Sequence, residues 1–533
     1  MNNRATTAIS PQNVDNVGLA AFSTCASPED SRLFTRLAWV AVAVGCLFRI
    51  FGYLLNRSLW LDEAYLALNI LHRSYAGLLR PLENHQGAPI GFLLLEKFAV
   101  RSLGANEYAL RLLPLVAGLI ALLLFCQTAR LALRPGAAAV ATALFAVSPS
   151  LLYYSSEVKQ YSGDVALAVL LYLVALGAPI ADWTLARIAA LGLIGGAAIW
   201  FSHPSVFVLA GIGVTVLGAC VARGHWSTLL RFCLAGLLWT ASALAAYFFV
   251  LRSLTRDPAL FQYWAENFMP LPPRSLSDWK WLVDSFFAFF SQTAGWEFAG
   301  LAALAFVLGF AGLWRTRRET LFLLLAPALL TLFASGLHKY PFGGRLTLFL
   351  VPAVLLVMGE GVEQLRLATR GHAAVIGYAF IILLLLDPTV YVLHHFAKPH
   401  ILIKHSGVMA PEEIKAVRTY VFNHQQPGDL IYLNTGSEPA WQFYDEVEGR
   451  AEPNLVYGTA AGDKVSDYAS DLDRLRGRRV WVILSHIGGG GARQAAYIEF
   501  YLDADGRRTD RFTAPGAEAD LYDLRLSAPA VQP

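Results

Sequence analysis

The sequence predicts an all-α polytopic membrane protein with a C-terminal soluble α/β domain, and two observations support this fold class. The 533-residue chain is 56% hydrophobic and only 15% charged, with a mean hydropathy of +0.47, whereas soluble domains carry about 25% charged residues. The hydrophobic residues also form blocks of about 20, the length that spans a bilayer. These blocks end near residue 393, and the rest of the chain has soluble character.

The apolar blocks number about eleven, and the first begins near residue 36. A shorter apolar stretch, Pro89–Val100, contains Glu96 and Lys97. We therefore expect it to form a helix lying at the membrane interface. The predicted spans are 36–55, 109–130, 136–154, 162–179, 184–201, 204–222, 229–251, 297–314, 319–337, 346–363 and 373–393.

Basic residues at the block ends predict the orientation. Cytoplasmic loops carry an excess of Lys and Arg, and an N-terminus placed inside puts at least one Arg in every inside loop. Residues 1–30 are polar and show no periodicity, which predicts a disordered cytoplasmic tail. An odd number of spans then places the C-terminal region outside. We expect a multi-pass protein of the plasma (inner) membrane, with a membrane domain at 31–395.

The C-terminal region, 405–533, is predicted to be an extracytoplasmic domain. It carries 13 Lys and Arg against 19 Asp and Glu, and this acidic balance argues against a nucleic-acid partner. Helix and strand patterns alternate along it, which favours an α/β domain with a largely parallel sheet. The predicted helices are 411–423, 465–475 and 492–501, and the predicted strands are 430–433, 479–485, 508–513 and 520–526.

The first outside loop, 56–107, opens with two adjacent carboxylates, Asp62 and Glu63, between aromatic residues. A carboxylate that is partly desolvated at the interface has a raised pKa, which suits a general base. The alternative is a solvated loop start or a helix N-cap formed by Asp62. Later in this loop His85 lies in a polar turn, where it could supply a metal ligand or a sugar hydrogen bond, or simply be exposed.

Two further outside loops carry cations. Glu157, Lys159 and Tyr161 lie in a short connection between apolar blocks, where loops usually contain Gly, Pro or Asn. An ion pair of Glu157 with Lys159 or with Arg345 is the structural alternative to a functional role. Lys339 and Arg345 precede the tenth predicted span, and a guanidinium at the membrane edge is well shaped to bind a phosphate.

Acids and cations on one face suit the transfer of a group away from a phosphate. An acid would deprotonate the acceptor hydroxyl, and the cations would stabilise the departing phosphate. Three motifs also resemble a known family: Trp60-Leu61-Asp62-Glu63-Ala64, Arg111-Leu112-Leu113-Pro114 at the start of the second span, and Glu157-x-Lys159-x-Tyr161. In this order, over about 35–395, they resemble the GT-C membrane glycosyltransferases, and glycosyltransferase family 39 in particular.

The resemblance implies an inverting transfer of a sugar from a polyprenyl-phosphate carrier on the outer side of the membrane. The acceptor would be a cell-envelope glycan, lipid or protein, and the first-loop Asp62 would be the general base. Some members of the family use a divalent metal ion, so a metal is left open. The expected catalytic residues are Asp62, Glu63 and Glu157, and the expected substrate-binding residues are His85, Lys159, Tyr161, Lys339 and Arg345.

Two other functions remain open at this point. A transporter or flippase of lipid-linked saccharides would carry charges within its spans and often an inverted repeat; here Arg49 and Asp164 are the main mid-span charges, and no repeat is evident. A ligase or polymerase of lipid-linked glycans would use a large outer loop that carries Arg or His. The loop 252–296 is long and contains Arg252, Arg256 and Arg274.

Overall fold

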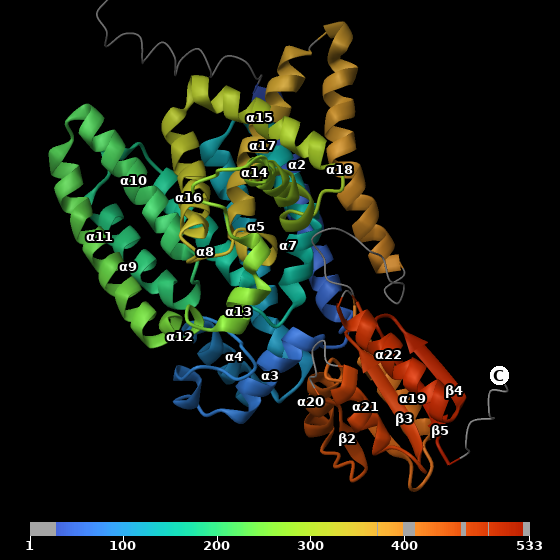
Figure 1. Ribbon diagram of the computed structural model, residues 1–533. Helices are drawn as coiled ribbons and strands as arrows, with labels where there is room; N and C mark the ends of the chain where they lie inside the picture. Colours follow the sequence, from blue (N-terminus) through green and yellow to red (C-terminus); the bar gives the residue numbers. More distant parts are fainter. Residues whose placement is uncertain (1–27, 370, 398–410, 460–464, 489, 526–533) are drawn as a thin grey trace, which may run out of the picture.

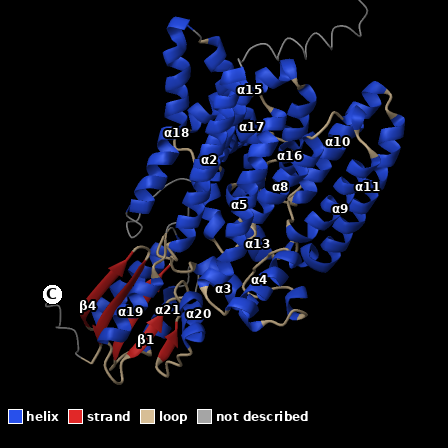
Figure 2. Ribbon diagram, turned by 180° about the vertical axis from the view of Figure 1, so that it is seen from behind, coloured by secondary structure: helices blue, strands red, loops and turns tan. Residues whose placement is uncertain are grey.

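A computed structural model of the protein describes residues 28–369, 371–397, 411–459, 465–488 and 490–525. It consists of a helical bundle and a smaller domain that contains all the described strands (Figures 1 and 2). Most of the predicted tail 1–30 and the predicted domain boundary at residue 405 lie outside the described residues. Pro28 to Asp30, the end of that tail, already belong to the first helix, α2 (Pro28–Leu54).

All eleven predicted spans coincide with helices, which confirms a multi-pass membrane protein. Within the described residues, eight helices are long and apolar enough to cross a membrane. They are α2, α5 (Glu107–Ala132), α10 (Ser205–Arg223), α11 (Trp226–Ala246) with its extension to Leu254, α15 (Ala299–Thr316), α16 (Arg318–Gly336), α17 (Val351–Ala368) with the preceding turn η7 (Gly344–Leu350), and α18 (Ala374–Ala397).

The other three predicted spans are shorter or bent. Helices α6 (Pro135–Val147) and α7 (Pro149–Tyr153) meet at an angle of 55°. Pro149 begins α7, and Ser148 caps it by accepting a hydrogen bond from the Leu151 N–H. A helix of about 20 residues spans the hydrocarbon core, and α8 (Tyr161–Leu176) and α9 (Leu185–Phe201) have 16 and 17 residues.

Helix α17 lies at the centre of the bundle and is almost entirely buried. It packs on α15 without intervening side chains, because a Cβ atom at Gly361 would lie only 1.8 Å from the Ala305 carbonyl oxygen. Such close backbone approach through small residues is the usual way in which membrane helices associate. The mid-span Arg49 is also buried, and it donates hydrogen bonds to the carbonyls of Phe145 and Ala146 where α6 ends.

The predicted outside loops form short helices, and those of the first loop lie at the end of the bundle that meets the soluble domain (Figure 1). In the first loop these are α3 (Leu61–His72), the turn η1 (Gly77–Leu79) and α4 (Ile90–Leu103), which is the predicted interfacial helix. The 252–296 loop forms α12 (Arg252–Leu254), α13 (Pro258–Tyr263), the turn η5 (Ala265–Asn267) and α14 (Leu276–Ala288).

The C-terminal domain is a five-stranded sheet with helices on both faces. The strand order is β2-β1-β3-β5-β4. Helices α19 and α20 pack on one face, and α21 and α22 pack on the other. The strands are β1 (Leu430–Leu433), β2 (Leu455–Tyr457), β3 (Arg479–Ser485), β4 (Arg507–Ala514) and β5 (Ala517–Asp523), and the helices are α19 (Ile414–His424), α20 (Glu438–Glu448), α21 (Val465–Asp473) and α22 (Gly490–Asp505).

The prediction of a largely parallel sheet was only partly right, because the sheet is mixed. Strands β2, β1 and β3 are parallel, but β5 runs antiparallel to both β3 and β4. Only Pro515 and Gly516 separate β4 from β5, and so short a connection forms a hairpin, whereas parallel neighbours need a long crossover. Helix α20 and strand β2 were not predicted at all.

The soluble domain shares a hydrophobic core with the first of the predicted outside loops. Leu59 and Ala64 from the start of that loop belong to the same buried cluster as Ile414 of α19 and Trp441 of α20. The Lys415 ammonium also lies 2.8 Å from the Glu107 carboxylate at the start of α5. The domain is therefore docked on the segment that presents Asp62.

Candidate active site

Asp62 is at the centre of a cluster of charges. It lies in the first turn of α3, and its two carboxylate oxygens are 3.0 Å from Lys159 Nζ and 2.9 Å from Arg345 Nη2. Gln86 donates to the same carboxylate at 2.9 Å and accepts a hydrogen bond from Lys159 at 2.7 Å. Two cations thus share one carboxylate.

The charge state of Asp62 differs from the prediction. Burial by itself would raise the pKa of Asp62, but the Lys159 and Arg345 charges and the Gln86 hydrogen bond hold this pKa well below its ordinary value. The raised pKa expected for an interfacial base is therefore wrong for this arrangement. Asp62 is therefore ionised at neutral pH.

Arg345 is enclosed by aromatic rings. Its guanidinium carbon lies 5.5, 6.0 and 5.8 Å from the ring centroids of Trp60, Tyr161 and Trp264, distances at which cation–π attraction holds the group in place. Its Nε is buried and has no hydrogen-bond partner among the described residues. The guanidinium therefore keeps a free donor beside Asp62.

Glu63 points away from this cluster and into a buried network. Its carboxylate accepts hydrogen bonds from Arg111 Nε at 3.1 Å and Nη2 at 2.8 Å, and from the Val158 N–H at 2.8 Å. Arg111 in turn donates to the carbonyls of Arg57 and Ser58. The two adjacent acids thus belong to separate hydrogen-bond networks. The network around Glu63 connects α3, α5 and the 155–161 segment.

Glu157 is buried beside Trp60, whose Nε1 donates to one carboxylate oxygen at 3.3 Å. The other oxygen has no partner among the described residues. Burial, together with the negative charge of Glu63, raises the pKa of Glu157 to about 7. The alternative ion pairs of Glu157 with Lys159 or Arg345 are absent from the part of the chain that the structure describes, because both cations bind Asp62.

Two predicted residues do not reach the cluster. His85 is 61% exposed and its Nδ1 lies 2.7 Å from the Asp257 carboxylate, while its neighbour Gln86 contacts Asp62. Lys339 is exposed and forms no ion pair with any described residue. Gln86 lies in the polar turn that the sequence analysis identified around His85. Nothing in the sequence indicated that Gln86, and not His85, would contact Asp62.

The soluble domain reaches the same site, which the sequence did not indicate. One Glu412 oxygen accepts the Leu61 N–H at 3.0 Å, and the other lies 2.7 Å from Nδ1 of His486. The His486 ring stacks on Trp60, with centroids 6.5 Å apart and the planes inclined by 21°. Glu413 accepts a hydrogen bond from the Ser58 hydroxyl at 3.0 Å.

A cavity of about 900 Å³ lies between the membrane helices and the soluble domain. Its apolar walls include Phe48 of α2 and Phe396 of α18, and its polar end includes Arg57 and Lys415. Arg57 donates to the Ser156 carbonyl at 3.1 Å, and its Nε has no hydrogen-bond partner in the described residues. The cavity is thus apolar on one side, and its polar end carries charges of both signs, because Glu413 also lines it.

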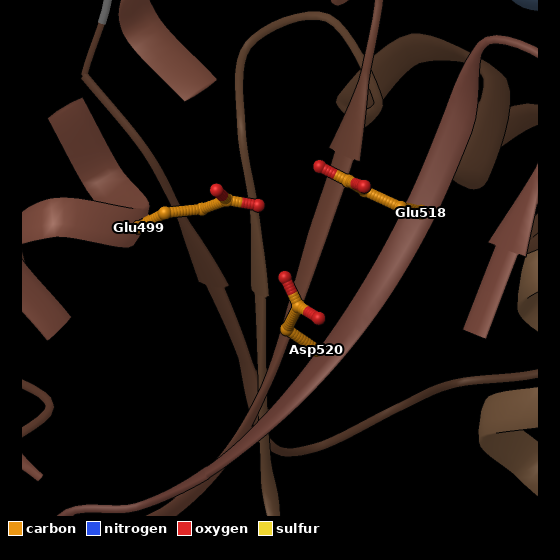
Figure 3. A group of neighbouring side chains, drawn as sticks. All are labelled: Glu499, Glu518 and Asp520. Atoms are coloured by element: carbon orange, nitrogen blue, oxygen red, sulfur yellow. The ribbon is translucent and has the colours of Figure 1, made fainter. Parts of the chain in front are cut away.

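A metal ion at Asp62 is not favoured by the side chains around it, because Lys159 and Arg345 already neutralise the carboxylate. Among the described residues, one group of acids has the geometry of a metal site: Glu499, Glu518 and Asp520 (Figure 3). It lies in the C-terminal domain, and Arg508 and Arg511 form ion pairs with these carboxylates. The group is thus a charge network between β5 and α22, and two of its three carboxylates are buried.

Solved structures resemble the whole chain. ArnT from Cupriavidus metallidurans aligns with a TM-score of 0.51 and 14% identity over 93% of this chain and 98% of that chain. Its form bound to undecaprenyl phosphate gives 0.50 and 13% over the same shares. An oligosaccharyltransferase from Archaeoglobus fulgidus aligns at 0.47 and 12% over 88% and 72%. No family model and no curated protein matches the sequence. The chain has the GT-C fold that its motifs predicted.

Proposed function

We propose that the protein is a membrane glycosyltransferase that takes a sugar from a polyprenyl-phosphate carrier and transfers it to a cell-envelope acceptor. The observation that carries this proposal is the Asp62 carboxylate held between Lys159 and Arg345. A GT-C fold shared with ArnT, which has been solved with undecaprenyl phosphate, supports it. Fold alone does not determine function, so the proposal rests on the side chains.

The carrier phosphate would replace Asp62 as the partner of the two cations. A phosphate binds a guanidinium through two parallel hydrogen bonds, and Arg345 has a free Nε for such an arrangement. When Lys159 and Arg345 turn to the phosphate, the pKa of Asp62 rises, because the charges that lowered it are withdrawn. Asp62 would then accept the proton of the acceptor hydroxyl as this oxygen attacks the sugar carbon and the phosphate leaves.

Glu157, Tyr161 and Glu63 would have supporting roles. Glu157 has a free carboxyl oxygen and a pKa of about 7, so it can donate or accept a hydrogen bond to a sugar hydroxyl. Tyr161 would hold Arg345 in its aromatic enclosure. Glu63 would position the 155–161 segment rather than touch substrate, because its carboxylate is fully engaged.

The acceptor would enter through the cavity that contains Arg57. This cavity begins at the membrane helices α2 and α18 and borders Ser156, the neighbour of Glu157. An amphipathic acceptor would match the apolar walls of this cavity, and its polar head group would meet the free Nε of Arg57. We place the site at the outer face of the plasma membrane, with the N-terminus cytoplasmic and the soluble domain extracytoplasmic, because the basic loops lie at the opposite end.

The test is transfer of a radiolabelled sugar from polyprenyl phosphate to acceptors in native membranes. We expect incorporation with the wild type and a loss of at least about 100-fold for Asp62→Ala. Equal incorporation would remove Asp62 from the mechanism. The same membranes, prepared as vesicles, distinguish the two other functions from this one. Flux of the lipid-linked sugar across the membrane without transfer would indicate a flippase, and preference for a pyrophosphate carrier would indicate a ligase or polymerase.

A further inference from the structure

His486 of the soluble domain lies at the active site in an unusual backbone conformation. It follows the last residue of β3, and its φ is +58°, in the left-handed region that non-glycine residues seldom adopt. Such a residue persists only where surrounding contacts fix it, and it is often found at functional sites. Here the contacts are the Glu412 carboxylate and the Trp60 ring.

The imidazole is oriented by both contacts. Glu412 lies 2.7 Å from Nδ1 and therefore favours the tautomer that carries its proton there. This leaves Nε2 as the basic nitrogen, and no described residue forms a hydrogen bond with it. The side chain remains 41% exposed, so Nε2 can exchange protons with water.

The same carboxylate ties this histidine to the catalytic segment. The second oxygen of Glu412 accepts the N–H of Leu61, the residue before Asp62. Trp60, on which the imidazole stacks, also covers the Arg345 guanidinium. Glu412 and Asp62 are the charged groups that act on His486 from the neighbouring segments. The hydrogen bond to Glu412, with the Glu412 and Asp62 charges, raises the pKa of His486 above its ordinary value.

We propose that His486, oriented by Glu412, accepts the acceptor's proton after sugar transfer, once Asp62 has released it. This inference rests on the proposed function. In the transfer step the acceptor oxygen forms its bond to the sugar carbon, the bond from that carbon to the phosphate oxygen breaks, and Asp62 takes the hydroxyl proton. The proton then reaches Nε2 of His486 through solvent, since no hydrogen bond joins the two side chains in the described residues, and it passes from there to bulk water; this restores the Asp62 carboxylate for its two cations.

The role predicts a particular pH dependence. His486 must be neutral to accept the proton, so the turnover rate should fall as the pH drops through the pKa of this histidine. Glu412→Gln removes the charge that raises this pKa, and the acid limb of the rate profile should then move to lower pH. The turnover rate of His486→Ala at pH 7.5 should be lower than that of the wild type by at least about tenfold. This loss is smaller than the rate acceleration that general acids and bases usually provide.

The experiment measures sugar transfer by the full-length protein from radiolabelled polyprenyl-phosphate sugar to native membranes, between pH 5 and 9. Added imidazole should restore the rate of sugar transfer by the His486→Ala protein, because the exposed position lets free imidazole enter the space of the missing ring. His424→Ala, which removes an exposed histidine of the same domain, should behave as the wild type. The affinity for undecaprenyl phosphate should be unchanged in all variants, and each variant should still show a cooperative melting transition.

Two results would overturn the proposal. One is a His486→Ala protein with the wild-type rate and pH profile. The other is a loss of rate that imidazole does not restore and that leaves the acid limb unchanged, which would indicate a purely structural histidine. The proposed function fails separately, since in that case the wild type itself would transfer no sugar.

Discussion

Replacing Asp62 by Asn should tighten the binding of the carrier phosphate while it abolishes transfer. In the wild type the carboxylate competes with the phosphate, because it already holds Lys159 and Arg345 at 3.0 and 2.9 Å. The asparagine amide keeps the shape of the side chain but has no charge. The two cations then have no anionic competitor, and an incoming phosphate does not have to displace one.

The magnitude follows from the geometry. Close ion pairs in protein interfaces show coupling energies of about 1.5–7 kcal/mol. If only the lower limit of one pair is recovered, the gain is about 1.5 kcal/mol, or roughly tenfold in Kd. Transfer should fall by about 100-fold or more, because the proton acceptor is lost. Tighter binding with lost turnover distinguishes this mechanism from a general loss of folding.

Tryptophan fluorescence in detergent provides the assay. Trp60 and Trp264 lie 5.5 and 5.8 Å from the Arg345 guanidinium, so undecaprenyl phosphate should alter their emission. Asp257→Asn is the matched control, since Asp257 pairs with His85 outside the cluster. Weaker binding by Asp62→Asn would refute the reasoning and would assign to this carboxylate a direct part in holding the phosphate, for instance through a metal ion.

Four further outcomes are expected. Glu63→Gln should lower the melting temperature strongly, because breaking a buried ion pair costs about 3–5 kcal/mol, whereas Glu83→Gln at the exposed pair with Arg73 should have little effect. Gly52→Trp, which fills part of the cavity, should block transfer without changing the affinity for undecaprenyl phosphate. Burial raises the pKa of Asp520 to about 6, so the folded state binds the extra proton and stability should fall as pH rises from about 4 to 6; thermal melts of Asp520→Asn should show a flatter profile. Chelation with EDTA should leave sugar transfer intact, since Lys159 and Arg345 supply the positive charge at the site; loss that Mg²⁺ or Mn²⁺ restores would contradict this.

The membrane part was predictable because a bilayer imposes a one-dimensional rule. A span needs about 20 apolar residues whatever its neighbours are, so each of the eleven blocks coincides with a helix or with a pair of consecutive helices. The strand order of the soluble domain has no such rule. Only the Pro515-Gly516 hairpin, a local feature, could have indicated that β4 and β5 are antiparallel.

For the site, the sequence by itself determined which loops carry the chemistry, because charged residues beside apolar blocks need a partner. Asp62, Lys159 and Arg345 were all identified in this way. Only the tertiary structure decided how they pair. Lys159 and Arg345 bind Asp62 because Trp60 already binds Glu157 and Arg111 already binds Glu63.

Tertiary structure alone also decided that the soluble domain contributes residues to the site. More than 400 residues separate Trp60 from His486, and no local pattern relates them. Their contact depends on the core shared by α3, α19 and α20, which forms only when the docked domains exclude water from the same apolar side chains. Hydrophobic patterns along the chain predict each helix, but they do not indicate which distant segment will pack against it.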